Sequence, residues 1–368
     1  MTIDPGFTTQ EMRRVFSAES RISLMCRFES ALAEAQAELG IVPAQAARAI
    51  ANACSNPRGD ADAILRRGWE TGTPVLALLD DLRTGLSEED GRWLHHGATT
   101  QDVADTALML QCQAALQSLD GDLTAAADRL AELADVYRET AALARTFYQP
   151  AVTTSFGSRV AGWLHPLVLV RRDSRRLSER LPIQLGGPVG DLVSYGDGAF
   201  TLGDRVAARL GLVGAVPWHT DRWPVQEVAG LLARAASACS KIATDVAVLA
   251  ADGEVRVRSG RSSSMSGKEN PVDAMRSEAA AQVCKVVVSG LVAPPSHVLE
   301  RGMGPWHAEW ALIPLAFQTA GASAAAIALC LDSLEVGVEA MKAAAGGEAP
   351  ADAGLIERVV TAHRELEG

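Results

Sequence analysis

The chain has 368 residues, of which 48% are hydrophobic and only 5% aromatic, and its formal net charge is −11. This negative charge argues against nucleic acid and anionic membranes as partners, but not against a small anion held by local arginines. A chain of this length can bury a large core. Abundant alanine and few aromatic residues favour closely packed helices over sheets.

The cysteines and one apolar segment bear on the compartment in which we expect the protein. Six scattered cysteines without a CxxC pair predict buried thiols in a reducing cytoplasm, and neither a disulfide framework nor a zinc site. No signal-peptide pattern is visible. Residues 310–331 carry no charge and are long enough to span a bilayer. Because they are rich in alanine and contain Pro314 and Gln318, we expect a buried core helix of an oligomer and no membrane partner.

The first segment of the chain predicts helices. Apolar residues recur at three- and four-residue spacing over residues 8–40, with an interruption at residues 17–20, which predicts two helices. Arg21 follows this interruption directly. It is either a surface cation or a clamp for a carboxylate, because the planar guanidinium matches carboxylate geometry. Residues 41–94 predict several short helices separated by breaks that contain Pro and Gly.

Polar residues crowd the predicted start of the next helix. Residues 95–102 read HHGATTQD and precede a helical pattern over residues 103–116. Hydroxyl, amide and free N–H groups at a helix start stabilise an anion. A helix cap explains Thr100 or Asp102 alone, but it does not explain the whole run, so the run is a candidate anion site.

Long helical patterns fill most of the remaining chain. They cover residues 117–145, 157–181, 225–249, 272–291 and about 310–342. The third of these patterns carries an apolar stripe of about seven turns, which implies a partner in a helical bundle. A Gly/Ala/Pro linker over residues 343–354 and a short charged helix over residues 355–366 follow.

One segment between two helical patterns gathers several hydroxyls, a lysine and an asparagine. Residues 261–271 read RSSSMSGKENP. A serine alkoxide is strongly disfavoured in water, but a nearby ammonium, amide donors and backbone N–H groups can stabilise it. Such a loop can also close over a substrate. The alternative is a solvated Ser/Gly linker.

Three of these stretches together resemble the conserved regions of the fumarase/aspartase superfamily. The loop is similar to the pattern SSxMPxKxNP, with Ser266 in place of the usual proline. Its matching residues are Ser262, Ser263, Met265, Lys268, Asn270 and Pro271. Residues 95–102 resemble the pattern HxGxTSxD, and residues 145–157 resemble RTHxQxAxxTxxG. The segments PWHTDR at residues 217–222 and ERGMGPWHAEW at residues 300–310 resemble the muconate cycloisomerase branch of that superfamily.

The resemblance implies an all-α fold of the fumarase/aspartase type. It implies a smaller N-terminal helical domain over residues 1–112 and a central bundle of long helices over residues 113–342. Residues 343–368 would be the remnant of a nearly absent C-terminal domain. In the superfamily four central bundles associate, and each active site draws its conserved regions from three subunits. We therefore expect self-association into a homotetramer with composite active sites.

The resemblance also implies the chemistry, which is anti β-elimination or addition next to a carboxylate of a small di- or tricarboxylate. The catalytic residues that it implies are Ser262 as the base, Lys268 and His96. The substrate-binding residues that it implies are Arg21, Thr99, Thr100, Thr146, Gln149, Ser263, Asn270 and Arg301. No metal and no organic cofactor is indicated.

The chain departs from the superfamily where a general acid is expected. Phe147 stands at the usual histidine, and Pro150 stands where the cycloisomerase branch has a histidine. His219 and Tyr148 remain as candidates for the acid. The first function implied is that of a 3-carboxy-cis,cis-muconate cycloisomerase. The alternatives are a lyase that releases fumarate from a substituted succinate, such as nitrosuccinate or an N-succinyl compound, and a catalytically silent oligomeric scaffold.

Overall fold

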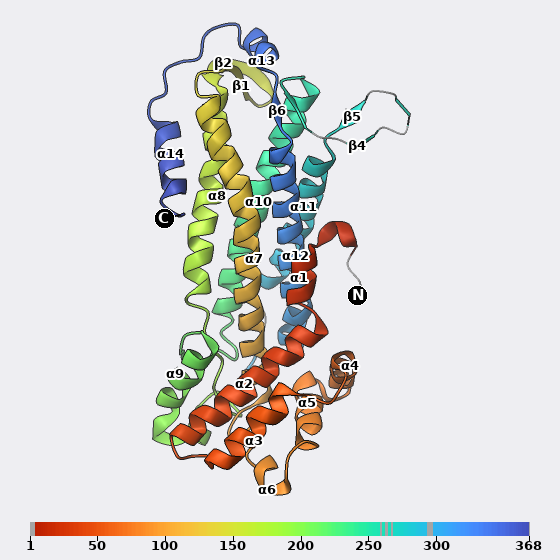
Figure 1. Ribbon diagram of the computed structural model, residues 1–368, viewed down its shortest axis with the longest axis vertical. Helices are drawn as coiled ribbons and strands as arrows, with labels where there is room; N and C mark the ends of the chain where they lie inside the picture. The colour runs from red at the N-terminus through yellow and green to blue at the C-terminus, as the bar shows by residue number, and fades with distance from the viewer. Residues whose placement is uncertain (1–3, 258–259, 262–263, 266–267, 293–296, 368) are drawn as a thin grey trace.

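Five long helices run side by side in an elongated bundle in the computed structural model (Figure 1). The structure describes residues 4–257, 260–261, 264–265, 268–292 and 297–367. The five helices are α7 (Thr100–Val136), α8 (Phe156–Ser178), α10 (Trp223–Ala251), α11 (Val272–Val292) and α12 (Pro305–Asp332). α12 packs against α11, α10 and α7, so it lies at the centre of the bundle. The predicted all-α fold is confirmed.

Shorter helices gather at the end of the bundle where α7 begins (Figure 1). They are α2 (Ala18–Glu38), α3 (Ala44–Ser55), α4 (Ala61–Thr71), α5 (Pro74–Arg83), α6 (Glu88–Gly91) and α9 (Ala199–Leu210), with the 3-10 helix η2 (Val193–Gly198). The helix α1 (Gln10–Val15) and the 3-10 helix η1 (Pro5–Phe7) instead lie along the bundle against α12. The predicted interruption near residue 17 is confirmed, because Ser17 caps α2 by accepting the Ser20 N–H at 3.1 Å.

α7 is one continuous helix of 37 residues and ends at Val136, so the predicted helix over residues 117–145 was wrong at its end. Strand β1 (Ala141–Thr146) follows and pairs antiparallel with β2 (Gln149–Ser155). The chain then reverses into α8 beside the end of α7. A Cβ at Gly157 would lie 2.6 Å from the Ala134 carbonyl oxygen, so this close approach requires glycine.

α12 also ends earlier than predicted, at Asp332 and not near residue 342. The chain leaves the helix because Gly337 N–H donates to the Glu254 carbonyl at 2.9 Å, which brings two short strands together. The remaining elements are β3 (Val255–Arg256) paired with β6 (Glu335–Val336), β4 (Gly260–Arg261) paired with β5 (Glu269–Asn270), α13 (Val338–Ala345) and α14 (Leu355–Arg364). α14 confirms the predicted short final helix and packs along α8 and α7.

Two further expectations concern whole segments. In the described chain, α12 is long and apolar enough to cross a membrane, and 61% of its most apolar window is buried inside the protein, as in the core helix of a bundle. The predicted boundary after residue 112 falls within α7. That helix therefore belongs both to the N-terminal helices and to the bundle, and the division into domains stays a prediction.

Candidate functional site

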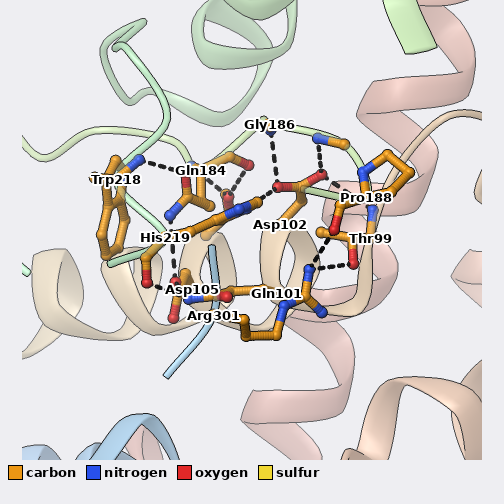
Figure 2. A network of polar contacts seen from close by, with 12 residues as sticks. Thr99, Gln101, Asp102, Asp105, Gln184, Gly186, Pro188, Trp218, His219 and Arg301 are labelled. Carbon is orange, nitrogen blue, oxygen red and sulfur yellow. Dashed lines mark hydrogen bonds and ion pairs between the residues drawn. The ribbon is translucent and has the colours of Figure 1, made fainter. Parts of the chain in front are cut away.

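The N-terminus of α7 meets an arginine from the segment before α12 (Figure 2). Arg301 donates from Nη2 to Thr99 Oγ1 at 2.8 Å and to the Pro188 carbonyl oxygen at 2.9 Å. Thr99 and Thr100 are half-buried at the positive end of this helix. A guanidinium beside a helix N-terminus suits a carboxylate, because both supply N–H donors and positive charge. Three of the predicted substrate-binding residues therefore lie together.

Asp102 holds the backbone around this pair in place and is fully buried. Its carboxylate accepts the Gly186 N–H at 2.9 Å, the Gly187 N–H at 3.0 Å and the Thr99 N–H at 3.1 Å. Gly187 has a φ of +73°, and a Cβ there would lie 2.5 Å from Ser194 Oγ. Asp102 thus joins the α7 start to the glycine-containing loop, beyond the helix-capping role that its position predicts.

His219, a candidate for the general acid, lies beneath this glycine loop (Figure 2). It is 4% exposed, and its Nε2 is 2.9 Å from Asp102 Oδ1. Its carbonyl oxygen accepts from Gln101 Nε2 at 2.8 Å. The geometry makes His219 a buried partner of Asp102. The two candidates for the acid therefore differ in accessibility, because Tyr148 is exposed and His219 is enclosed.

A buried charge cluster lies one turn further along α7. Arg222 contacts Asp105 through two hydrogen bonds of 2.7 and 2.9 Å and contacts Glu309 at 2.6 Å. Trp306 Nε1 donates to Asp105 at 2.8 Å. Burial opposes ionisation of Asp105, but the Arg222 charge outweighs it and lowers the pKa of Asp105. Burial outweighs the Arg222 charge at Glu309 and raises the pKa of Glu309, and the nearby Asp105 carboxylate raises it further. The cluster joins α7, α12 and the segment before α10.

The turn that carries His96 is fixed by its neighbours. His95 has a φ of +62°, which is rare for a residue with a side chain. Its Nδ1 lies 2.6 Å from Glu29 Oε1. Burial by itself lowers the pKa of His95, but the Glu29 carboxylate outweighs burial, so this pKa is raised. The His96 carbonyl oxygen accepts from Gln36 Nε2 at 2.8 Å. These contacts hold His96 just before the Thr99–Arg301 pair.

Arg21 lies elsewhere. Its guanidinium carbon sits over the Trp310 ring, 4.8 Å from the ring centroid. The structure does not bring it to the Thr99–Arg301 pair, and its role as a substrate ligand stays a prediction.

The predicted residues of the second region lie at the opposite end of α7. Arg145 forms ion pairs with Asp252, at 2.8 Å, and with the buried Glu254. Thr146 and Gln149 are exposed at the tip of the β1–β2 hairpin. A helix of 37 residues is about 55 Å long. Residues on either side of it cannot meet around one small molecule within a single chain.

Strands β4 and β5, which belong to the serine-rich segment, lie at the same end of the bundle as the hairpin (Figure 1). Ser262 and Ser263, the predicted base and its neighbour, lie outside the residues that the structure describes. Lys268 is exposed and Asn270 half-buried, on or beside β5. In the described ranges, no three His, Cys, Asp or Glu side chains form a group that could hold a metal ion.

Sequence reasoning gave no role to Asp105, Arg222 or Glu309. Arg222 and Glu309 do stand in the two segments that resemble muconate cycloisomerases, which was the available signal. Their pairing could not be found from one sequence, because Asp105 and Arg222 are 117 positions apart. The position of Asp105 inside an otherwise apolar helical pattern indicated only that it needs a partner.

An all-α bundle of long helices with shorter helices at one end is the architecture of a fumarase/aspartase-type lyase. The family model described as lyase matches residues 6–289. A 3-carboxy-cis,cis-muconate cycloisomerase of Bradyrhizobium diazoefficiens is 36% identical over 353 residues, covering 92% of this chain and 77% of that protein. A nitrosuccinate lyase of Streptomyces davaonensis is 37% identical, covering 88% of this chain and 72% of that protein.

Solved structures agree with this assignment. The 3-carboxy-cis,cis-muconate lactonizing enzyme from Pseudomonas putida superimposes with a TM-score of 0.86 at 33% identity, covering 92% of this chain and 78% of that one. The chain therefore belongs to the lyase family of the fumarase/aspartase superfamily, in its muconate cycloisomerase branch.

Proposed function

We propose that the chain is a 3-carboxy-cis,cis-muconate cycloisomerase-like enzyme, which catalyses anti addition or elimination next to a carboxylate. The observation that carries this proposal is the Thr99–Arg301 pair at the α7 N-terminus. It offers a carboxylate a guanidinium, a hydroxyl and the positive end of a long helix. The relatives in the cycloisomerase branch support the choice of substrate class, a small tricarboxylate.

In the proposed elimination, the Ser262 alkoxide removes the proton alpha to a carboxylate. The electron pair moves onto that carboxylate as an enediolate, which then expels the group on the neighbouring carbon. In the addition direction the Ser262 hydroxyl returns a proton to the same carbon. The proposed donors to the enediolate and the other carboxylates are Thr99, Thr100, Thr146, Gln149, Ser263, Lys268, Asn270 and Arg301. His96 is proposed to stabilise the group that departs or attacks.

The missing acid is consistent with this chemistry. Phe147 and Pro150 occupy the positions of the expected histidines. When a lactone ring opens by elimination, the departing group is a carboxylate, whose conjugate acid has a pKa of about 4. Such a group leaves without being protonated, so the reaction does not require a general acid at position 147 or 150.

We propose that the active site is composite and that the enzyme is a cytoplasmic homotetramer. The length of α7, about 55 Å, supports this, because the Thr99–Arg301 pair and the hairpin and serine loop lie beyond opposite ends of it. α12 carries no charged residue over residues 310–331 and leaves Leu329 55% exposed, which favours a further helix partner on that face.

A second candidate is the release of nitrite and fumarate from nitrosuccinate. The nitrosuccinate lyase of Streptomyces davaonensis is as similar to this chain as the cycloisomerases. Nitrite is also a good leaving group, so this reaction equally tolerates the loss of the acid.

The decisive assay follows the ultraviolet absorbance of 3-carboxy-cis,cis-muconate with the purified protein. Loss of the conjugated-diene absorbance, abolished by Ser262→Ala, supports the cycloisomerase. Nitrite and fumarate formed from nitrosuccinate, with no change in the muconate, support the second candidate. If neither substrate reacts, the enzyme proposals are wrong and the silent scaffold is favoured.

A further inference from the structure

A small cavity of about 90 Å³ lies where α2, α7 and α12 meet. Its wall includes Ser17, Arg21, Leu108, Gln111, Trp310 and Pro314. Leu108 and Gln111 lie 8 and 11 residues beyond Thr100, which is about 12 and 16 Å along the helix axis. The buried Asp105–Arg222–Glu309 cluster lies nearer to the α7 start. Ala104, about 6 Å beyond Thr100 along the helix axis, also lines the cavity, but its wall includes neither Thr99 nor Arg301. The cavity is therefore distinct from the Thr99–Arg301 pair.

Two polar side chains of this cavity, those of Arg21 and Trp310, are donors without an acceptor in the part of the chain that the structure describes. Among the described residues, the Arg21 guanidinium has neither a hydrogen-bond acceptor nor a carboxylate partner, and contacts the face of Trp310. Burial lowers the pKa of Arg21 to about 10. Trp310 Nε1 is buried and has no hydrogen-bond partner in the described chain. The Trp310 N–H is a buried donor without an acceptor, which costs about 1–3 kcal/mol. The Arg21 side chain beside it is half-buried and has no carboxylate partner among the described residues, so both residues would gain from an acceptor between them.

The start of α2 adds positive potential to the same wall. Ser17 is the N-cap of α2, a helix of 21 residues, and Ser17 and Ala18 both line the cavity. The N-terminus of such a helix carries about half a positive charge. Gln111 Nε2 donates to the Val15 carbonyl at 2.9 Å, so one N–H of this amide is already used within the chain. Cation, indole N–H and helix start all favour a negative ligand.

We propose that this cavity binds one small planar oxyanion, of the size of formate or nitrate, between the Arg21 guanidinium and Trp310 Nε1. The planar fork of arginine matches two oxygens of such an ion. The cavity, of about 90 Å³, suits an ion of the size of formate better than a larger di- or tricarboxylate. The site goes beyond the proposed function and does not depend on it. A bound anion would neutralise a buried cation and tie α2 to α12.

The test uses the full chain and isotope-labelled formate, followed by NMR line broadening and by isothermal titration at constant ionic strength. We expect saturable binding that falls at least tenfold in Arg21→Met. Arg27→Met is the matched control, because Arg27 is an exposed arginine on the same helix, and it should bind as the wild type does. Arg301→Met separates the two sites, and the formate signal at the cavity should persist in it.

If Arg21→Met does not fold, Trp310→Phe tests the proposed formate site. It keeps an aromatic face for Arg21 and removes only the indole N–H, so affinity should fall several-fold. Succinate at equal concentration should not displace formate. The proposal is wrong if the wild type shows no saturable formate binding, if Arg301→Met abolishes it, if both cavity variants retain it, or if succinate competes equally. None of these outcomes depends on whether a muconate is turned over.

Discussion

The two ends of α7 differ in how deeply the chain buries its polar groups. At the N-terminal end, Asp102 accepts from three backbone N–H groups and contacts His219, and the side chains of Asp102 and His219 are both buried. Arg222 is enclosed by two carboxylates there. At the hairpin end, Arg145 is anchored by Glu254, but the tip is bare. Phe147 is 97% exposed and Tyr148 76%.

The N-terminal end therefore has the properties of a preorganised support, and the hairpin end has those of a contact surface. A buried network held by several hydrogen bonds needs little rearrangement when a ligand arrives, although His219 Nδ1 and Gln101 Oε1 have no hydrogen-bond partner among the described residues. An exposed aromatic tip gains nothing within its own chain, and its apolar surface is typical of an interaction site. This comparison supports the proposed composite site, in which the carboxylate end of one copy would be completed by the hairpin end of another.

The largest expected effect comes from disabling each end in turn. We expect Arg301→Met and Ser262→Ala each to lower the rate of muconate turnover by about 10²–10³-fold, since each removes a group that acts on the transition state. If sites are composite, co-assembled mixtures of the two variants should regain activity, because some sites receive both intact ends. The measurement is the absorbance assay on separately purified and on co-expressed variants.

Mixtures as inactive as the single variants would contradict the composite site, provided that size-exclusion chromatography shows mixed oligomers. A monomer with full activity would contradict it as well.

Removing the central cation at each end should affect stability unequally. Arg222→Met leaves Asp105 and Glu309 buried without a cation, so we expect a loss of about 3–5 kcal/mol in the free energy of unfolding. Arg145→Met should cost only about 1 kcal/mol, because Arg159 remains 3.8 Å from Glu254. Urea unfolding followed by circular dichroism gives both values. Equal losses would remove the distinction between the two ends.

A substitution at the hairpin tip should raise the free energy of unfolding and impair function. Phe147 and Tyr148 have φ values of 51° and 61°, and this left-handed turn favours Asn-Gly. Replacing Phe147→Asn together with Tyr148→Gly should raise the free energy of unfolding by about 1–2 kcal/mol. We expect the same change to weaken self-association or turnover, measured by light scattering and by the absorbance assay. Gained stability with unchanged assembly and rate would mean that the aromatic tip is unused.

The smallest effect is a pH-dependent one at the turn before Thr99. Because the pKa of His95 is raised by Glu29, its pair is fully formed below the unfolded histidine pKa of about 6.5 and weakens as pH rises through the folded value. Glu29→Gln should therefore cost about 1 kcal/mol at pH 6 and less at pH 9. Urea unfolding at both pH values measures this difference.

Glu34→Gln, an exposed carboxylate on the same helix, is the control and should show no such change with pH. A cost of Glu29→Gln that grows towards pH 9 would show the opposite linkage and exclude the ion pair.

The sequence alone determined the long helices and the residues that resemble the superfamily. Helical periodicity is a local property, so α8, α10, α11 and α14 were predicted close to their observed bounds. The errors in the predicted helix ends lie where pairing with another segment decides the backbone conformation. Residues 141–145 form a strand because β2 pairs with them, and α12 ends at Asp332 because β6 pairs with β3.

Only the tertiary structure decided which of the candidate residues meet. It joined Arg301 to Thr99 across 202 positions and placed Arg21 on Trp310, apart from that pair. It also gave Asp105 its partners, Arg222 and Trp306. Such pairings depend on how helices are packed, and periodicity carries no information about which distant residue lies opposite. The length of α7 then set the two ends too far apart for one chain to join them.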